Sequence, residues 1–172
     1  MDIKQHIRDI VDFPKQGIIF KDITPLMLDP EVMNATVDQL LALIPKDVKI
    51  DKLVAMESRG FFFGTLIAQR LGAGFVPARK KGKLPFETCV ATYELEYGID
   101  QIEIHIDAIK PGENVLIHDD VLATGGTAKA VTEIVEQLGG SIIQCQFLMQ
   151  LDFLKGREKL FPYPVASLLN YQ

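Results

Sequence analysis

The feature of the sequence that most constrains its fold is a repeated order of strand, loop and helix. In the first copy, KLVAM at 52–56 predicts a short buried strand, ESRG at 57–60 a turn, and FFFGTLIAQRLG a helix that ends at Gly72. A further strand is expected in GFVPAR, at 74–79. Repeated units of this kind predict an α/β fold with a mainly parallel central sheet flanked by helices.

The copy near the carboxyl end is the clearest. It consists of a strand, a loop, a helix and a second strand, at residues 115–118, 119–126, 127–138 and 142–151. Between the two copies, a charged loop at 80–87 precedes two segments that resemble a hairpin, Cys89–Tyr97 and Gln101–Ile106, turning at Gly98.

The amino-terminal part follows a different pattern. Apolar residues at helical spacing predict one helix within 3–11 and another within 32–44. Prolines and glycines between them favour an irregular connection with one short extended piece at 18–20. Although the order of elements recurs, no stretch of amino-acid sequence is repeated, and no segment has the composition of a linker. We therefore expect a single domain over residues 1–172.

Composition narrows the possible functions. The formal net charge of −5 argues against a general nucleic-acid binder, because such proteins neutralise phosphates with a basic face. No apolar stretch approaches the ~20 residues that span a bilayer, and the charged amino terminus lacks the apolar core of a secretory signal. Cys89 and Cys145 have no neighbouring histidines at metal-ligand spacing. We therefore expect a cytoplasmic protein with reduced cysteines, no structural zinc, and no nucleic-acid or membrane partner.

Two adjacent acids, Asp119 and Asp120, lie between the apolar run VLIH and a segment of small residues. The segment contains Ala123, Thr124, Gly125, Gly126 and Thr127. Consecutive backbone N–H groups at such a helix start form a concavity that binds phosphate, and glycine lets a ligand reach the main chain. Carboxylates a few residues earlier suit a sugar's vicinal hydroxyls, or a magnesium ion bound directly or through water. The pattern therefore predicts a site for ribose 5-phosphate.

Simpler interpretations of the same residues stay open at this point. A Gly-Gly pair alone is more often an ordinary turn between a strand and a helix, and paired acids in a loop are usually just solvated. The two common nucleotide-binding glycine motifs, GxxxxGK[ST] and GxGxxG, do not open any helix of this sequence.

The stretch VLIHDDVLATGGTA, residues 115–128, resembles the phosphoribosyl-diphosphate signature of the type I phosphoribosyltransferases. Four other parts of the chain are similar to adenine-specific members of that family, in the same order from Phe13 to Leu160: FPKQGIIFKDITPLM, ESRGFFFG, RKKGKLP with YELEYG, and LKGREKL. The resemblance implies the type I phosphoribosyltransferase fold, with a small hood contributed mainly by about 1–30 and a flexible lid at about 80–95.

The same resemblance implies an activity. A 5-phosphoribosyl group would pass from phosphoribosyl diphosphate to adenine, giving AMP and diphosphate in a step of purine salvage. It also implies a homodimer and a requirement for Mg2+, held through substrate and water near Asp119 and Asp120 rather than by direct protein ligands.

The resemblance assigns diphosphate binding to five residues: Ser58, Arg59, Arg79, Lys80 and Lys83. An arginine at a helix start is electrostatically poor, because a cation there faces the positive end of the dipole, and this favours an anionic ligand at Arg59. The cluster ARKKGK has an alternative interpretation as a solvated loop or a weak nucleic-acid patch.

Catalytic roles follow for Arg59 and for Glu96, which would assist proton transfer at the purine. The residues implied around adenine are Ile19, Phe20, Lys21 and Tyr97, with Phe20 stacking on the ring. Two residues depart from the family pattern. Many relatives have arginine where this chain has Lys21, and lysine offers no planar fork. An aliphatic residue is common at His118, which we interpret as a tolerated strand histidine.

Two alternative functions remain. The first is a transferase for hypoxanthine, guanine or xanthine; such relatives recognise the 6-oxo group with a lysine from the penultimate strand, and FLMQL at 147–151 has none. The second is a non-catalytic regulator that senses phosphoribosyl diphosphate. A regulator needs a DNA-binding segment, for which the pattern leaves no room, and the acidic net charge disfavours it.

Overall fold

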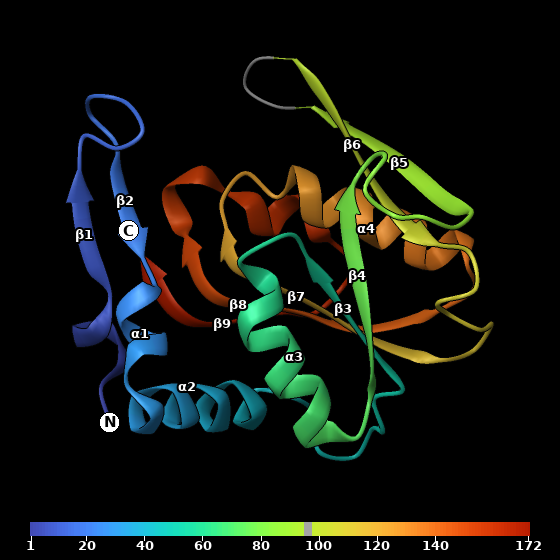
Figure 1. Cartoon of the computed structure of the whole chain (residues 1–172), viewed down its shortest axis with the longest axis horizontal. Coiled ribbons are helices and arrows are strands. Elements are labelled where there is room, and N and C mark those ends of the chain that lie inside the picture. Colours follow the sequence, from blue (N-terminus) through green and yellow to red (C-terminus); the bar gives the residue numbers. More distant parts are fainter. Residues whose placement is uncertain (95–97) are drawn as a thin grey trace. The chain divides into compact units, whose positions relative to one another are not determined.

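The computed structural model describes residues 1–94 and 98–172, which form two compact units, Met1–Ala42 and Leu43–Gln172. The described part of the larger unit is built on one seven-stranded sheet with the order β5-β6-β4-β3-β7-β8-β9 (Figure 1). Its strands are β3 (Lys52–Met56), β4 (Gly74–Lys80), β5 (Thr88–Glu94), β6 (Ile99–His105), β7 (Asn114–Leu122), β8 (Ser141–Leu151) and β9 (Val165–Tyr171). Its helices are α3 (Gly60–Leu71), α4 (Gly126–Gln137) and the short 3-10 turns η2 (Asp152–Leu154) and η3 (Gly156–Leu160).

The sheet is mainly parallel, as the repeated units predict. Strand β3 pairs in parallel with β4 and β7, and β7, β8 and β9 continue the parallel order. Strands β6 and β5 run antiparallel at the edge beside β4 and form the predicted hairpin, of which residues 95–97 lie outside the described part of the chain. The predicted α/β fold is therefore confirmed.

Both faces of the central strands are buried, which explains why they read as continuous apolar runs. Leu53 and Ala55 of β3 approach Gly64 of α3. The alternate residues Val54 and Met56 belong to a core cluster that also contains residues of α4. The connections β3-α3-β4 and β7-α4-β8 leave the centre of the sheet in opposite directions. Since such crossovers are right-handed, α3 and α4 cover opposite faces (Figure 1).

This topology predicts where a ligand binds. From β3 the chain continues to β4 on one side of it in the sheet, whereas from the adjacent strand β7 it continues to β8 on the other side. The order of strands therefore reverses between β3 and β7. In open parallel sheets, ligands occupy the crevice beyond the carboxyl ends of the strands at such a reversal. The turn after β3 and the segment after β7 are therefore the two sides of the expected site.

One predicted boundary near that site is wrong. Residues 119–122, expected in a loop, continue strand β7, and Asp119, Val121 and Leu122 pair with Phe147, Met149 and Gln150 of β8. The long apolar strand β8 offers backbone partners beyond His118, and these hydrogen bonds outweigh the local polar signal of the two acids. The sequence analysis also did not predict β9, which pairs with β8.

The smaller unit contains η1 (Ile3–His6), β1 (Arg8–Val11), β2 (Ile19–Asp22), α1 (Thr24–Leu28) and α2 (Pro30–Ala42). The helix expected within 3–11 is wrong beyond its first turn. Residues 8–11 instead form a hairpin with β2, in which Ile10 lies opposite Phe20. Cross-strand ion pairs stabilise this hairpin, since Arg8 binds Asp22 at 2.5 Å. The extended piece near 18–20 and the helix within 32–44 are confirmed.

None of the helices in the described ranges is long and apolar enough to cross a bilayer.

Candidate active site

A cavity of about 450 Å³ opens at the reversal point between β3 and β7. One side is the turn after β3, with Glu57, Ser58 and Arg59. The other side is the end of β7, with Asp119, Asp120, Val121 and Ala123. The structure thus brings together the ESRG turn and the acid pair, which lie about sixty residues apart in the sequence and which the sequence analysis assigned to one substrate.

The two acids lie in different surroundings. Asp120 is buried, and its Oδ2 forms an ion pair with Nε of Arg59 at 2.6 Å. Asp119 is half-buried, and its Oδ1 accepts a hydrogen bond from the backbone N–H of Asp120 at 2.9 Å. Burial and the neighbouring charge of Asp120 raise the pKa of Asp119 well above its usual value. Burial raises the pKa of Asp120 as well, although the Arg59 guanidinium opposes that shift.

A second cavity, of about 80 Å³, adjoins the first and is lined by the small-residue segment. Its lining includes residues 123–128 together with Asp119 and Phe147. Gly125 has φ +78° and caps α4, whose first residue is Gly126. In the described ranges, no backbone carbonyl in a loop, turn or cap accepts a hydrogen bond from the amides of residues 124–127. Such amides at the positive end of a helix form an anion site.

We call this anion site, formed by residues 123–128, the cradle. Its shape depends on a glycine for which no role was predicted from the sequence. Gly156, the first residue of η3, packs directly on the backbone of 123–125. A Cβ on Gly156 would lie 2.9 Å from the amide nitrogen of Gly125, and a Cβ on Gly125 would lie 2.5 Å from the carbonyl oxygen of Gly156. The two backbones therefore support each other only because both positions lack a side chain. The quoted stretch LKGREKL was the only sequence signal for this contact.

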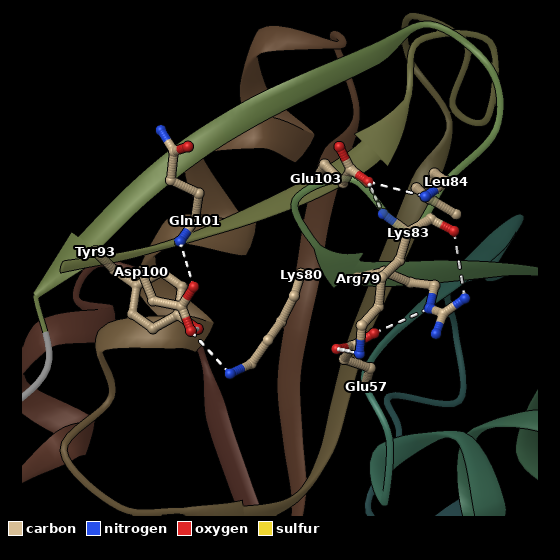
Figure 2. Close-up of polar contacts among 9 residues, drawn as sticks. All are labelled: Glu57, Arg79, Lys80, Lys83, Leu84, Tyr93, Asp100, Gln101 and Glu103. Carbon is tan, nitrogen blue, oxygen red and sulfur yellow. Dashed lines mark hydrogen bonds and ion pairs between the residues drawn. The ribbon is translucent and has the colours of Figure 1, made fainter.

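Three of the basic residues assigned to diphosphate, Arg79, Lys80 and Lys83, lie at the end of β4 and in the turn that follows. Arg79 and Lys83 both bind the carboxylate of Glu57, at 2.9 and 2.7 Å (Figure 2). Lys80 binds Asp100 at 2.9 Å instead, on the other side of the strand (Figure 2). The ESRG turn was predicted to bind diphosphate through Ser58 and Arg59, and no role was predicted for Glu57.

A buried acid on β6 fixes the turn that carries Lys83. Glu103, 3% exposed, accepts hydrogen bonds from the backbone amides of Lys83 and Leu84 at 3.0 and 2.9 Å (Figure 2). Its other oxygen accepts a hydrogen bond from the hydroxyl of Thr88 at 3.1 Å. Burial alone would raise the pKa of Glu103, but the backbone donors lower it below its ordinary value. One charged carboxylate therefore holds the turn at Lys83 and Leu84 as well as the first residue of β5.

The residues assigned to adenine are in the smaller unit, on β2. Phe20 packs edge to face against Phe13, with ring centroids 5.3 Å apart. Nζ of Lys21 binds Asp9 at 2.7 Å across the hairpin. Ile19 is exposed. The assigned Glu96 and Tyr97 lie outside the described residues.

The larger cavity contains oxygen donors of the kind that a magnesium ion requires. Asp119 and Asp120 supply the hard carboxylate oxygens that magnesium prefers. In the described ranges, however, no group of three or more His, Cys, Asp or Glu side chains is arranged to hold a metal ion. These residues fit a magnesium ion that takes most of its ligands from water and from substrate oxygens.

His118 lies immediately before the acid pair but is not exposed to either cavity. Its side chain is buried within β7, opposite Gln146 of β8. Burial lowers its pKa to about 4, so the imidazole is neutral at physiological pH.

Comparison with known proteins identifies relatives along the whole chain. A model of the phosphoribosyl transferase domain family matches residues 31–164. An adenine phosphoribosyltransferase from Flavobacterium johnsoniae is 61% identical over 171 residues, which are 99% of this chain and 100% of that protein.

Solved structures give the same result. An adenine phosphoribosyltransferase from Thermoanaerobacter pseudethanolicus has a TM-score of 0.94 and 51% identity, over 99% of this chain and 98% of that one. The enzyme from Saccharomyces cerevisiae, complexed with D-2,5-dideoxy-2,5-imino-altritol 1,6-bisphosphate and adenine, has a TM-score of 0.90 and 48% identity, over 95% and 94%.

Proposed function

Because the chain belongs to the phosphoribosyl transferase domain family, among its adenine phosphoribosyltransferases, we propose that it converts adenine and phosphoribosyl diphosphate into AMP and diphosphate. The observation that carries this proposal is the pairing of two adjoining cavities at the carboxyl end of β7. One is lined by backbone amides and the other by two carboxylates and Arg59. A phosphate and a sugar joined to it need these two environments side by side.

The substrate would bind in a fixed order along β7. Its 5-phosphate accepts hydrogen bonds from the amides of 124–127, and the Thr124 and Thr127 hydroxyls could add further hydrogen bonds. Asp119 and Asp120 accept hydrogen bonds from the ribose hydroxyls. This orientation directs the anomeric carbon and the diphosphate toward Ser58 and Arg59, which line the same cavity as the acids.

The reaction exchanges one bond at the anomeric carbon for another. The C–O bond to diphosphate breaks as a ring nitrogen of adenine forms the new C–N bond, and that nitrogen loses its proton. Positive charge develops on the sugar, so fixed carboxylates nearby stabilise the transition state more than the ground state. Arg59, together with Arg79, Lys80 and Lys83, would hold the departing diphosphate. Mg2+, when bound, would neutralise part of the diphosphate charge.

Three further parts of the proposal rest on the family resemblance. Glu96 would assist proton transfer at the purine, with Tyr97 beside it, and residues 80–95 would form a lid. Ile19, Phe20 and Lys21 would surround adenine, with Phe20 stacked on the ring. The protein would act in the cytoplasm as a homodimer, so light scattering should return twice the chain mass of 19.2 kDa.

The test is an assay of diphosphate release from phosphoribosyl diphosphate in the presence of magnesium, carried out with each purine base separately. We expect turnover with adenine and none with guanine, hypoxanthine or xanthine. Turnover with a 6-oxopurine but not with adenine would assign the chain to another base. Absence of turnover with every base, together with a mobility shift on DNA, would favour a regulator.

A further inference from the structure

Every cation that the proposed function assigns to diphosphate is already paired with an acid of the same chain. Arg59 binds Asp120, and Lys80 binds Asp100. Arg79 and Lys83 share a single partner, Glu57. The diphosphate of the substrate therefore meets cations that are neutralised in its absence.

Glu57 differs from the other acids in its geometry. Its carboxylate divides between two cations, since Oε2 accepts a hydrogen bond from Nε of Arg79 at 2.9 Å and Oε1 one from Nζ of Lys83 at 2.7 Å (Figure 2). The Glu57 side chain is only 7% exposed, whereas those of Arg79 and Lys83 are 36% and 49% exposed. Burial alone would raise the pKa of Glu57, but hydrogen bonds from the two cations lower it, so the group stays charged.

The position of Glu57 brings it into contact with the incoming anion. It directly precedes Ser58 and Arg59 and lines the same cavity as Asp119 and Asp120. A diphosphate that reaches Arg79 and Lys83 from this cavity replaces the Glu57 carboxylate as their partner. The replaced carboxylate is then a buried negative charge beside another anion, which costs free energy.

The turn that carries Lys83 does not depend on Glu57 for its position. Glu103 binds the backbone amides of Lys83 and Leu84 from the opposite side (Figure 2). Arg79 is fixed by its backbone, since it pairs with Glu103 across β4 and β6. Loss of the Glu57 charge would therefore free the two cations without releasing the segment on which they lie.

From these contacts we infer that Glu57 is an internal counter-ion that competes with the substrate's diphosphate for Arg79 and Lys83. This inference rests on the proposed function. Glu57 weakens the binding of diphosphate and speeds its departure as a product, and it keeps the two cations positioned while the site is empty. It acts through the cations and is a positioning residue, not a catalytic one.

The experiment measures binding of magnesium diphosphate to the full chain by calorimetry, and its dissociation by stopped flow. Glu57→Gln keeps the size of the side chain but removes its charge. We expect about fivefold tighter binding, because two half-exposed ion pairs each contribute at most about a few-fold in affinity. We expect the dissociation rate constant to fall by a similar factor. If the substitution merely damaged the structure, diphosphate would bind more weakly, so the two explanations predict opposite changes in affinity.

Two further variants complete the design. Asp47→Asn removes an exposed acid from the loop that precedes β3, outside the lining of both cavities, and should leave the affinity at the wild-type value. Glu57→Asp keeps the charge but withdraws it from both cations by one methylene, and should tighten binding by less than Glu57→Gln does. If Glu57→Gln yields no folded protein, Glu57→Asp decides alone, and tighter binding is again the expected result.

The outcomes separate this inference from the proposed function. Wild-type protein that binds diphosphate, with unchanged or weaker binding in the Glu57 variants, overturns the counter-ion role only. Equal tightening by Asp47→Asn also overturns it, because the lower net negative charge of the protein would then explain the effect. Wild-type protein that neither binds diphosphate nor forms AMP overturns the proposed function and this inference together.

Discussion

Asp119 carries a charge that folding disfavours. It is half-buried next to a second acid, and burial and the charge of Asp120 both raise its pKa. Asp120 forms an ion pair with Arg59, whereas Asp119 accepts a hydrogen bond from the backbone amide of Asp120. An acid retained at such a position indicates that its charge serves a ligand, since a neutral residue would be more stable there.

Replacement of Asp119 by asparagine should raise stability and reduce substrate binding at the same time. The folded carboxyl keeps its proton to a higher pH than the unfolded one, so its contribution to stability falls as pH rises above about 4. Asp119→Asn should remove that slope and raise the melting temperature at pH 7 by about 3 °C, for a gain of about 1 kcal/mol. Melting curves from pH 4 to 8 would measure it.

The same variant should bind phosphoribosyl diphosphate at least about tenfold more weakly, because an amide replaces a charged acceptor for the ribose hydroxyls. Adenine binding should not change. A variant that is less stable than wild type and binds phosphoribosyl diphosphate equally well would show that Asp119 is a structural residue.

At the scale of elements, the cradle is built from two segments that the chain brings together through the sheet. Residues 123–125 follow β7, and Gly156 starts η3 shortly after β8, the parallel neighbour of β7. Gly156 packs on the 123–125 backbone without room for a Cβ. The amides of the cradle are therefore held in place by η3 as well as by α4.

Gly156→Ala should disturb the cradle from outside the binding surface. The added methyl group forces the backbone of 123–125 to move, which should destabilise the fold by about 1–3 kcal/mol, as overpacking typically does. Affinity for AMP should fall at least about tenfold, because the amides no longer converge on one point. Calorimetry with AMP and thermal melting would measure both effects.

Gly74→Ala is the matched control. The atoms nearest to a Cβ at Gly74 would belong to the flexible Lys52 side chain, the first of them at 3.1 Å. This variant should bind AMP like the wild type. If Gly156→Ala also binds AMP like the wild type, η3 does not shape the phosphate site.

The central elements could be predicted from local sequence because their signals agree. Strands β3 and β4 and helix α3 have apolar runs, and α3 ends at Gly72, which has φ +65°. The extension of β7 through Asp119 and Asp120 could not be predicted, because it depends on backbone partners in β8. The hairpin at 8–11 was missed for the same reason, since β2 overrides a helical spacing of apolar residues.

The site was predictable only in part. The acid pair and the glycine segment are contiguous, so their chemistry is visible in the sequence. Glu57, Glu103 and Gly156 act through residues that are distant in the sequence, and a single acid or glycine gives no local signal. Their roles follow from β-sheet register and from backbone contacts, which only the folded chain supplies.

At the scale of the whole molecule, an acidic chain gathers its functional cations around one crevice. The formal net charge is −5, yet Arg59, Arg79 and Lys83 lie at the carboxyl ends of neighbouring strands β3 and β4. Carboxylates of the same region neutralise them. The phosphate recognition that we propose would therefore depend on local charges and not on the net charge of the chain.

A complex with the proposed product tests the central claim most directly. We propose a crystal structure of the full chain with AMP. The account predicts that the phosphate accepts hydrogen bonds from the amides of 124–127, that the ribose hydroxyls contact Asp119 and Asp120, and that the adenine ring stacks on Phe20. A phosphate bound elsewhere, with those four amides facing solvent, would contradict it.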